Sequence, residues 1–465
     1  MKKGKKKFKL VDAILATVCI TLVAESVMPT AAIGNSQYFW WLFLIIFFCV
    51  PYGMIAAELS TTYPSEAGLY DWVKRAFGPK WAGRVAWNYW VNFPLWISSL
   101  ATAVTTIIAS LLGFEMVWWV VLIIQLLYIV LVSFLGTKRV GESKYIVNLG
   151  TVFKVILLAG IGILGFVYYF KNGSANPITG IKDLLPDLSL NIDSGLPFIS
   201  IIIFNFLGFE VVGSFVNDME NPKKDIPKAL IIGGLFMAIL YILPATGFNI
   251  VLGGSSIDPA DVVAVLEGIF ASMGFAGGLL TSLLWISGAM FIYTFIANIA
   301  SWSFGVNEVA KYAADDGAMP KIFSGSNEEG VASNASIING VVAAVISVVG
   351  VVVAQFFANF EDAFNLFFHL SWITLLFSYV PMFLAFLKLR KVDGNIERPY
   401  KVPGGKFVVR LFGIVPFVLL MLGILFTLFG DFSLEYLKDN IPLIVGVVLS
   451  FIIEEILVAR IKDKK

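Results

Sequence analysis

The sequence predicts an all-α integral membrane protein with twelve transmembrane helices, and three observations support this. Of the 465 residues, 58% are hydrophobic and only 14% are charged, whereas a soluble domain is about 25% charged. The apolar residues gather in segments of about 20 residues, the length that spans a bilayer as a helix. Runs such as 41–50 and 341–353 do not alternate apolar and polar residues, which excludes a β-barrel.

Each predicted span is an apolar run bounded by polar or charged loops. The runs lie at 12–33, 38–60, 85–112, 116–135, 145–170, 196–216, 229–252, 271–305, 335–357, 363–387, 407–429 and 440–459. The first is not a cleaved signal peptide, because its apolar stretch is longer than a signal core and no clear cleavage site precedes the second span. No loop is long enough for a soluble domain, so we expect one transmembrane domain over residues 1–465.

The distribution of lysine and arginine predicts the orientation of the chain, since cytoplasmic loops carry the excess of these residues. With the N-terminus in the cytoplasm, 29 of the 33 basic residues lie on the cytoplasmic side. The other four are Lys154, Lys171, Lys182 and Lys438. We therefore expect a multi-pass protein of the cell membrane with both termini in the cytoplasm.

Two of the predicted spans are interrupted near their middle. The first contains Glu25 and Pro29, and the sixth contains Glu210 between Gly208 and Gly213. A simple kink at the proline and close helix packing at the glycines are the alternative interpretations. Broken helices five spans apart predict an inverted repeat. The repeats would be helices 1–5 (12–170) and 6–10 (196–387), followed by helices 11–12 (407–459).

Charged groups inside the spans are the candidate functional residues. A carboxylate at the bilayer centre costs roughly 2.5–3.5 kcal/mol even on mild insertion scales, so Glu25 and Glu210 are expected to have a function. Lys154 is the one basic residue well inside a span, unless its side chain reaches the cytoplasmic interface. His369 titrates in a range that suits gating, although a histidine in an aromatic run is more often structural.

The composition excludes several classes of function. A net charge of +1 offers no basic surface for nucleic acid. One histidine and two scattered cysteines, Cys19 and Cys49, provide no metal cluster or disulfide framework. We expect no catalytic residues, no cofactor and no metal. A channel, which would need a continuous polar path, and a scaffold without flux remain as the competing classes.

Five segments resemble the amino acid–polyamine–organocation permeases, in order along nearly the whole chain. Residues 208–210 read GFE, as in helix 6 of that family, and residues 64–73 and 314–320 resemble its loop patterns P-x-[AS]-G-G-x-Y-x-[WY] and A-x-D-[GN]-x-[LF]-P. Residues 220–227 and 398–405 match E-N-P-x-[KR]-x-[IF]-P and R-P-[FY]-K-x-P-G-G. Glu66, Ala67 and Met319 depart from these patterns. The resemblance implies a leucine-transporter-type fold with five-plus-five inverted repeats.

The resemblance also implies roles for individual residues. Amino acid permeases of the family have a glycine-rich break in helix 1 that holds the substrate carboxylate, whereas this chain has Ala24, Glu25 and Ser26. An anion there should repel a carboxylate and attract an ammonium or guanidinium group. Phe204 and Trp302 stand where antiporters of arginine and agmatine have substrate-facing aromatic residues. The alternative for both is ordinary packing.

Two further residues would take part in coupling. Lys154 is similar to a helix-5 lysine that replaces sodium in some permeases. Gly208 and Glu210 would help to bind the substrate, and Glu210 would also act as a proton-linked switch. We therefore expect an antiporter for a cationic amine, most specifically agmatine and putrescine. The alternative is amino acid exchange or permeation, such as glutamate for γ-aminobutyrate, tyrosine for tyramine, or a cationic amino acid, with or without proton coupling. The expected partners are the small substrate, the lipid bilayer and a second copy of the chain.

Overall fold

The computed structural model describes residues 10, 14, 18, 21–65, 67–138, 140–186, 199–208, 210, 221–253, 261–355, 363–430 and 432–461. Cys19, Glu66, Phe209, Gly213 and Glu220, which the sequence analysis named, lie outside these residues, as does the basic N-terminal tail. The described residues are helical, with turns and short irregular segments between the helices.

Ten helices in the described part of the chain are long and apolar enough to cross a membrane. The first is a composite of η2 (Gly34–Ser36), α3 (Gln37–Leu44), η3 (Ile45–Cys49) and α4 (Val50–Thr62). The others are α6 (Pro79–Leu112), α7 (Trp118–Leu135), α8 (Val140–Asn172), α10 (Pro222–Leu252), α12 (Gly277–Asp315), α13 (Ser333–Ala354), α14 (Ala363–Val392), α15 (Lys406–Phe429) and α17 (Ile441–Val458). Ten of the twelve predicted spans are thus present as long helices.

The remaining two predicted spans are the interrupted ones, and each lies partly outside the described residues. In the first, a short 3-10 helix, η1 (Ala24–Ser26), precedes α2 (Val27–Ala31). In the sixth, α9 (Ile199–Phe204) ends in a turn over residues 205–208. The described residues therefore contain the break in the first span and the beginning of the break in the sixth, whose residues 209 and 211–213 lie outside them. The count of twelve spans stays a prediction from the sequence.

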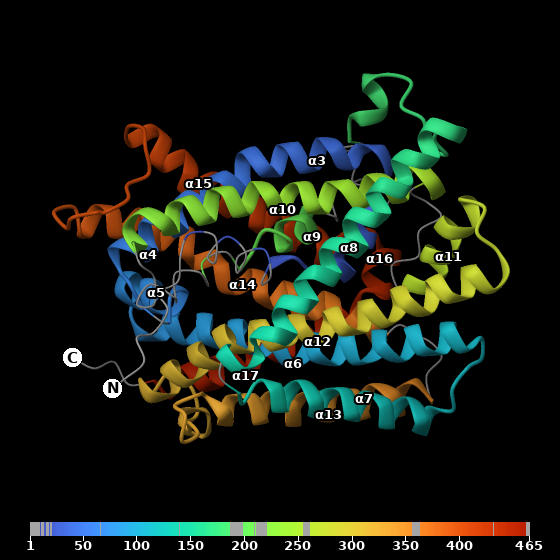
Figure 1. The fold of residues 1–465 in the computed structure, drawn as a ribbon. Helices are drawn as coiled ribbons and strands as arrows, with labels where there is room; N and C mark the ends of the chain where they lie inside the picture. Colours follow the sequence, from blue (N-terminus) through green and yellow to red (C-terminus); the bar gives the residue numbers. More distant parts are fainter. Residues whose placement is uncertain are drawn as a thin grey trace, which may run out of the picture.

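Short helices also lie between the long ones. They are α5 (Leu69–Phe77), η4 (Ile181–Leu184), α11 (Val262–Ser272), η7 (Lys321–Ser324) and α16 (Leu434–Asp439). Gly78, at φ +89°, ends α5 and turns the chain into α6, because glycine adopts a left-handed backbone without the steric cost of a Cβ atom. Figure 1 shows α5 and the segment after α14 at one end of the bundle, with α11 and the segment after α8 at the other.

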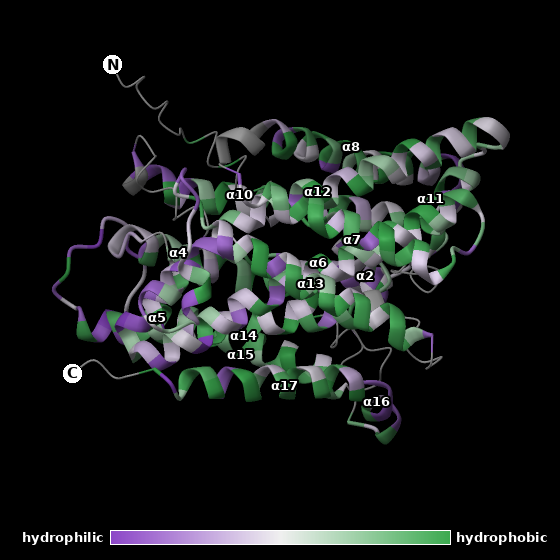
Figure 2. Cartoon of the chain, turned by 90° about the horizontal axis from the view of Figure 1, so that it is seen from below, coloured by the Kyte–Doolittle hydropathy of each residue, from purple (hydrophilic) through white to green (hydrophobic). Residues whose placement is uncertain are grey.

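The helices run side by side, and the central ones pack closely. Helix α14 packs against α6, α10 packs against α8, and α12 contacts both α6 and α8. Hydrophobic residues cover the long helices, while hydrophilic residues gather near α5 (Figure 2). This distribution suits a bundle whose middle lies in hydrocarbon and whose α5 end lies in water.

A buried carboxylate holds the α5 end of the bundle together. Glu58, on α4, is 2% exposed. It accepts hydrogen bonds from Arg390 Nε at 2.6 Å, Arg398 Nε at 3.0 Å and the backbone N–H of Val402 at 2.7 Å. These contacts join α4, α14 and the R-P-Y-K-V-P-G-G segment. We call this group the charged clamp.

Three asparagines form a ring at the opposite end. Asn35 donates to the side-chain oxygen of Asn176 at 3.1 Å, Asn176 donates to that of Asn249 at 3.0 Å, and Asn249 donates to that of Asn35 at 2.6 Å. The ring joins η2, the segment after α8 and the last turn of α10. Each side chain gives and receives one bond, so the asparagine ring closes on itself.

Candidate functional site

The break in helix 1 leaves backbone groups that no helix can pair. Leu22 and Val23 are not helical, and η1 begins at Ala24. The break precedes Pro29, which lies within α2. Ser26 donates its hydroxyl proton to the backbone oxygen of Val23 at 2.7 Å. Ala24, Glu25 and Ser26 are all buried, as expected for residues at membrane depth.

Glu25 is joined to two tryptophans from other helices. Its carboxylate accepts a hydrogen bond from the indole N–H of Trp96, on α6, at 3.0 Å. Trp96 packs edge-on against Trp302, on α12, with ring centroids 5.8 Å apart. Glu25, Trp96 and Trp302 are 2%, 2% and 3% exposed. The structure thus brings the predicted acid and the predicted stacking tryptophan to one place, with Trp96 between them.

Gly208 lies against the same tryptophan. Its φ of +101° is a conformation that side chains with a Cβ rarely adopt. A Cβ there would also lie 2.8 Å from Cζ2 of Trp302 and 3.2 Å from Cγ2 of Thr21. The turn after α9 therefore passes directly over Trp302 and the break in helix 1, and this passage requires glycine.

Lys154 joins the break in helix 1 to helix α12. Its Nζ donates to the backbone oxygen of Leu22 at 2.5 Å and to Oδ1 of Asn298 at 2.8 Å. The side chain is 1% exposed, so its ammonium group does not reach the membrane surface.

Glu210 lies in a cage of tyrosines. Tyr52 on α4 and Tyr379 on α14 donate hydrogen bonds to its two carboxylate oxygens, and the hydroxyl of Tyr89 on α6 is 3.4 Å from Oε1. All three tyrosines are at most 3% exposed. The partners of Glu210 differ from those of Glu25, so the two acids belong to separate contact networks.

Phe204 packs against α14. Its ring centroid lies 6.0 Å from that of Phe368 and 6.5 Å from that of Trp372. His369 also packs on Trp372, at 4.2 Å, and its Nδ1 lies 2.7 Å from the backbone oxygen of Asn365. Phe204 thus joins α9 to α14 by aromatic contacts.

Several site residues were missed from the sequence. They are Trp96, Asn298, Tyr241 and the three tyrosines around Glu210. Tyr241, on α10, accepts a hydrogen bond from the N–H of Val23 at 2.8 Å and donates one to the backbone oxygen of Thr21 at 2.9 Å. The sequence has no signal that marks them. The chain has 15 tyrosines and 12 tryptophans, and nothing in the sequence shows which of these contact a buried acid.

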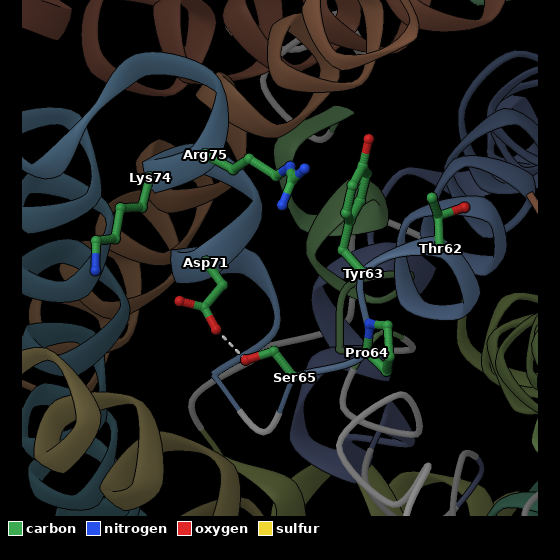
Figure 3. A pocket seen from close by; sticks show the side chains of 7 residues that line it. All are labelled: Thr62, Tyr63, Pro64, Ser65, Asp71, Lys74 and Arg75. Atoms are coloured by element: carbon green, nitrogen blue, oxygen red, sulfur yellow. Dashed lines mark hydrogen bonds between the residues drawn. The ribbon is translucent and has the colours of Figure 1, made fainter. Parts of the chain in front are cut away.

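A surface pocket lies beyond the C-terminal end of α4. It has a volume of about 550 Å³ and is lined by Thr62, Tyr63, Pro64, Ser65, Asp71, Lys74 and Arg75 (Figure 3). Tyr52 lies ten residues before Thr62 on α4, which is about 15 Å of helix. The pocket is therefore separate from the tyrosine cage around Glu210, and it is formed around the loop motif at residues 64–73.

Arg75, in the wall of the pocket, bonds to a carboxylate at the end of α14. Asp393 accepts hydrogen bonds from Arg75 Nε at 2.7 Å and from the Tyr63 hydroxyl at 2.9 Å. The hydrogen bond from Arg75 holds the pKa of Asp393 below its usual range. Burial, together with the bond to Asp393, raises the pKa of Tyr63 to about 12. These contacts fasten α5 to the end of α14.

The site has the means to bind a cation but no arrangement for covalent chemistry. Its acids are held by indole and phenol groups. In the described part of the chain, no group of three or more histidine, cysteine, aspartate or glutamate residues could hold a metal ion. A buried carboxylate beside aromatic rings binds ammonium or guanidinium groups by charge and by cation–π contact.

Comparisons with known proteins agree with this chemistry. The family model described as amino acid permease matches residues 8–451. The chain is 39% identical over 462 residues to the probable agmatine/putrescine antiporter AguD of Lactococcus lactis, covering 99% of this chain and 96% of that protein. It is 24% identical to the lysine-specific permease LysP of Lactococcus lactis, covering 80% and 72%. It is 26% identical to a probable polyamine transporter of Arabidopsis thaliana, covering 80% and 71%.

A solved structure supports the fold. The manganese transporter of Eremococcus coleocola superimposes with a TM-score of 0.57 at 14% sequence identity, covering 97% of this chain and 94% of that one. At this identity the likeness concerns the arrangement of the helices and not the substrate.

Proposed function

Because the chain belongs to the amino acid permease family and is a transporter, we propose that it exchanges agmatine for putrescine across the cell membrane. The observation that carries this proposal is the buried carboxylate of Glu25 at the break in helix 1. Two unit charges 4 Å apart interact by about 4 kcal/mol at an effective dielectric constant of 20. Glu25 therefore favours a cationic amine and disfavours a substrate carboxylate.

The neighbouring residues complete the proposed site. Glu25 would bind one cationic end of the substrate, with Ala24 and Ser26 beside it in the break. Trp302 would stack on the substrate, and its position is fixed by Trp96 on one side and Gly208 on the other. Phe204 would close over the bound amine from α9. The 39% identity to an agmatine/putrescine antiporter supports this choice of substrates.

Lys154 and Glu210 would provide the coupling. The Lys154 ammonium group bonds to the oxygens of Leu22 and Asn298, and oxygens are also the ligands of alkali cations. We propose that it replaces a sodium ion between helix 1 and α12. Glu210, held by tyrosines of α4, α6 and α14, would link substrate or proton binding to movement of these helices.

The orientation and the repeats belong to the same proposal. Both termini would lie in the cytoplasm, with the charged clamp on the cytoplasmic side and the asparagine ring on the outer side. Residues 12–170 and 196–387 would form the inverted repeats, with 407–459 added to them. A homo-oligomer is part of the proposal, and each chain would form a transport path of its own.

Counterflow in proteoliposomes tests the proposed function. Vesicles loaded with unlabelled putrescine should take up labelled agmatine with saturable kinetics, and vesicles without an internal amine should take up little. A channel would give uptake that does not saturate, and a scaffold would give none. Uptake of an α-amino acid in place of either amine would contradict the amine proposal and favour amino acid exchange.

A further inference from the structure

Three consecutive residues at the break in helix 1 expose backbone groups that are already paired by side chains. The Thr21 oxygen accepts from Tyr241, the Leu22 oxygen accepts from Lys154, and the Val23 N–H donates to Tyr241. An unpaired polar group at this depth would be costly. The chain itself therefore supplies the partners that a ligand could otherwise provide.

Tyr241 is held rigidly in this position. It is 0% exposed, and its ring stacks on Trp41 with centroids 5.6 Å apart and planes 20° apart. Trp41 in turn packs edge-on against Phe206, in the turn after α9, at 5.5 Å. The hydroxyl group is thus fixed by two hydrogen bonds to helix 1 and by a stack of rings that reaches the break in helix 6.

A free backbone N–H at a helix break is a favourable partner for a carboxylate. In this chain the N–H of Val23 is occupied by the Tyr241 hydroxyl, and two residues later Glu25 presents a negative charge. A substrate with an α-carboxylate would lose the donor and meet the anion, whereas an amine without a carboxylate needs neither backbone group.

We propose that Tyr241 is a specificity-determining and positioning residue, which excludes α-amino acids by occupying the Val23 N–H and the Thr21 oxygen. This inference rests on the proposed amine transport. Two residues would then reject a substrate carboxylate. Glu25 would repel it by charge, and the Tyr241 hydroxyl would occupy the Val23 N–H that could otherwise bind it. In this arrangement the substrate would meet side chains, while the Val23 N–H and the Thr21 and Leu22 oxygens stay paired within the chain.

The substitution Tyr241→Phe tests the proposal, because it keeps the ring and removes only the hydroxyl group. Arginine and agmatine differ by one carboxylate, so each is tested as an inhibitor of labelled agmatine counterflow. We expect inhibition by arginine, relative to agmatine, to strengthen roughly ten- to hundredfold, the worth of one hydrogen bond to a charged group. The matched control is Tyr436→Phe, since Tyr436 also donates to a helix carbonyl, that of Thr427, and should leave the ratio unchanged.

The possible outcomes distinguish a failure of the Tyr241 proposal from a failure of the proposed transport function. If the wild-type protein does not carry agmatine, the proposed function is wrong. If it carries agmatine and Tyr241→Phe leaves the arginine-to-agmatine ratio unchanged, the role of Tyr241 is wrong. If the role of Tyr241 were purely structural, Tyr241→Phe would lower agmatine counterflow and leave the ratio of inhibition by arginine and by agmatine constant.

A second measurement needs no variant. Hydrogen exchange of the wild-type peptide that spans residues 21–26 should show protection of the Val23 amide without any amine, because Tyr241 already holds it. Addition of agmatine should leave this protection unchanged. Protection that appears only after agmatine is added would overturn the proposal.

Discussion

Glu25 is the residue on which substrate binding is expected to depend most. Glu25→Gln keeps an oxygen that can accept the hydrogen bond from Trp96 but removes the charge. Because the charge contributes about 4 kcal/mol at close range, we expect the affinity for agmatine to fall roughly 100-fold or more. Thermal shift of the purified protein, titrated with agmatine, measures this loss. Glu435→Gln, on the short helix α16, is the control, and an unchanged affinity for agmatine in Glu25→Gln would remove Glu25 from the site.

A substitution at Gly208 tests the close approach of helix 6 to Trp302. In Gly208→Ala, the added Cβ would lie 2.8 Å from the indole, at a backbone φ of +101°. A strained backbone of this kind costs about 1–3 kcal/mol, so we expect a lower unfolding temperature and weaker agmatine binding. Gly53→Ala is the matched control, because nothing lies within 4 Å of its Cβ position. Equal behaviour of the two variants would contradict the described packing.

The candidate site residues that could be predicted from the sequence are the charged residues inside apolar spans. Glu25, Lys154 and Glu210 stand out in apolar runs, since lipid excludes such groups. Trp96, Tyr241 and the tyrosines around Glu210 have no such signal, because an aromatic residue is ordinary in a membrane span. Their roles arise only when helices distant in the sequence come together, as with Tyr89 and Glu210.

Among the structural elements, the long helices were predicted well and the short ones were not. The apolar run at 407–429 became α15 over Lys406–Phe429, since length and hydropathy alone define such a span. The run at 271–305 misplaced both ends of α12, which begins at Gly277 and continues to Asp315, because its last turns mix buried residues such as Ala310 and Ala313 with charged ones. Helix α5 carries Asp71, Lys74 and Arg75, so a search for apolar runs could not find it.

The charged clamp is expected to be the most sensitive contact between elements. Glu58→Gln would leave Arg390 and Arg398, which are 15% and 7% exposed, without their anion. Breaking a buried ion pair by removing one partner costs about 3–5 kcal/mol. We expect a clearly lower unfolding temperature, measured by scanning fluorimetry in detergent. Glu397→Gln, an exposed acid in the same segment, is the control, and equal stability of both variants would contradict the clamp.

The contact between α5 and α14 should respond to pH. Arg75 lowers the pKa of Asp393, so the carboxylate adds stability above the unfolded pKa of about 4 and loses it as the pH falls through the folded value. The contribution is small, within about 1 kcal/mol, because Arg75 is largely exposed. The difference in unfolding temperature between wild type and Asp393→Asn should be constant above about pH 5 and close below about pH 4. If the difference in unfolding temperature persists at low pH, protonation of Asp393 is not what weakens this contact.

For the whole molecule, the position of Lys154 predicts exchange without sodium. Its ammonium group occupies the space between the Leu22 and Asn298 oxygens, where a sodium ion would compete with a fixed charge. Agmatine–putrescine counterflow should therefore keep its rate when sodium is replaced by choline on both sides. A rate that falls with sodium removal would show that Lys154 does not fill the cation position.

The asparagine ring and the charged clamp hold the two ends of the molecule by contacts of different kinds. The ring of Asn35, Asn176 and Asn249 contains only neutral amides, and a hydrogen bond of this kind contributes about 0.5–1.5 kcal/mol. The clamp of Glu58 with Arg390 and Arg398 is a buried ion pair, which salt screens much less than an exposed pair and which costs about 3–5 kcal/mol to break. In the proposed orientation, the cytoplasmic end would therefore be held closed more firmly than the outer end. A carrier without substrate would then rest with its site facing the surroundings of the cell.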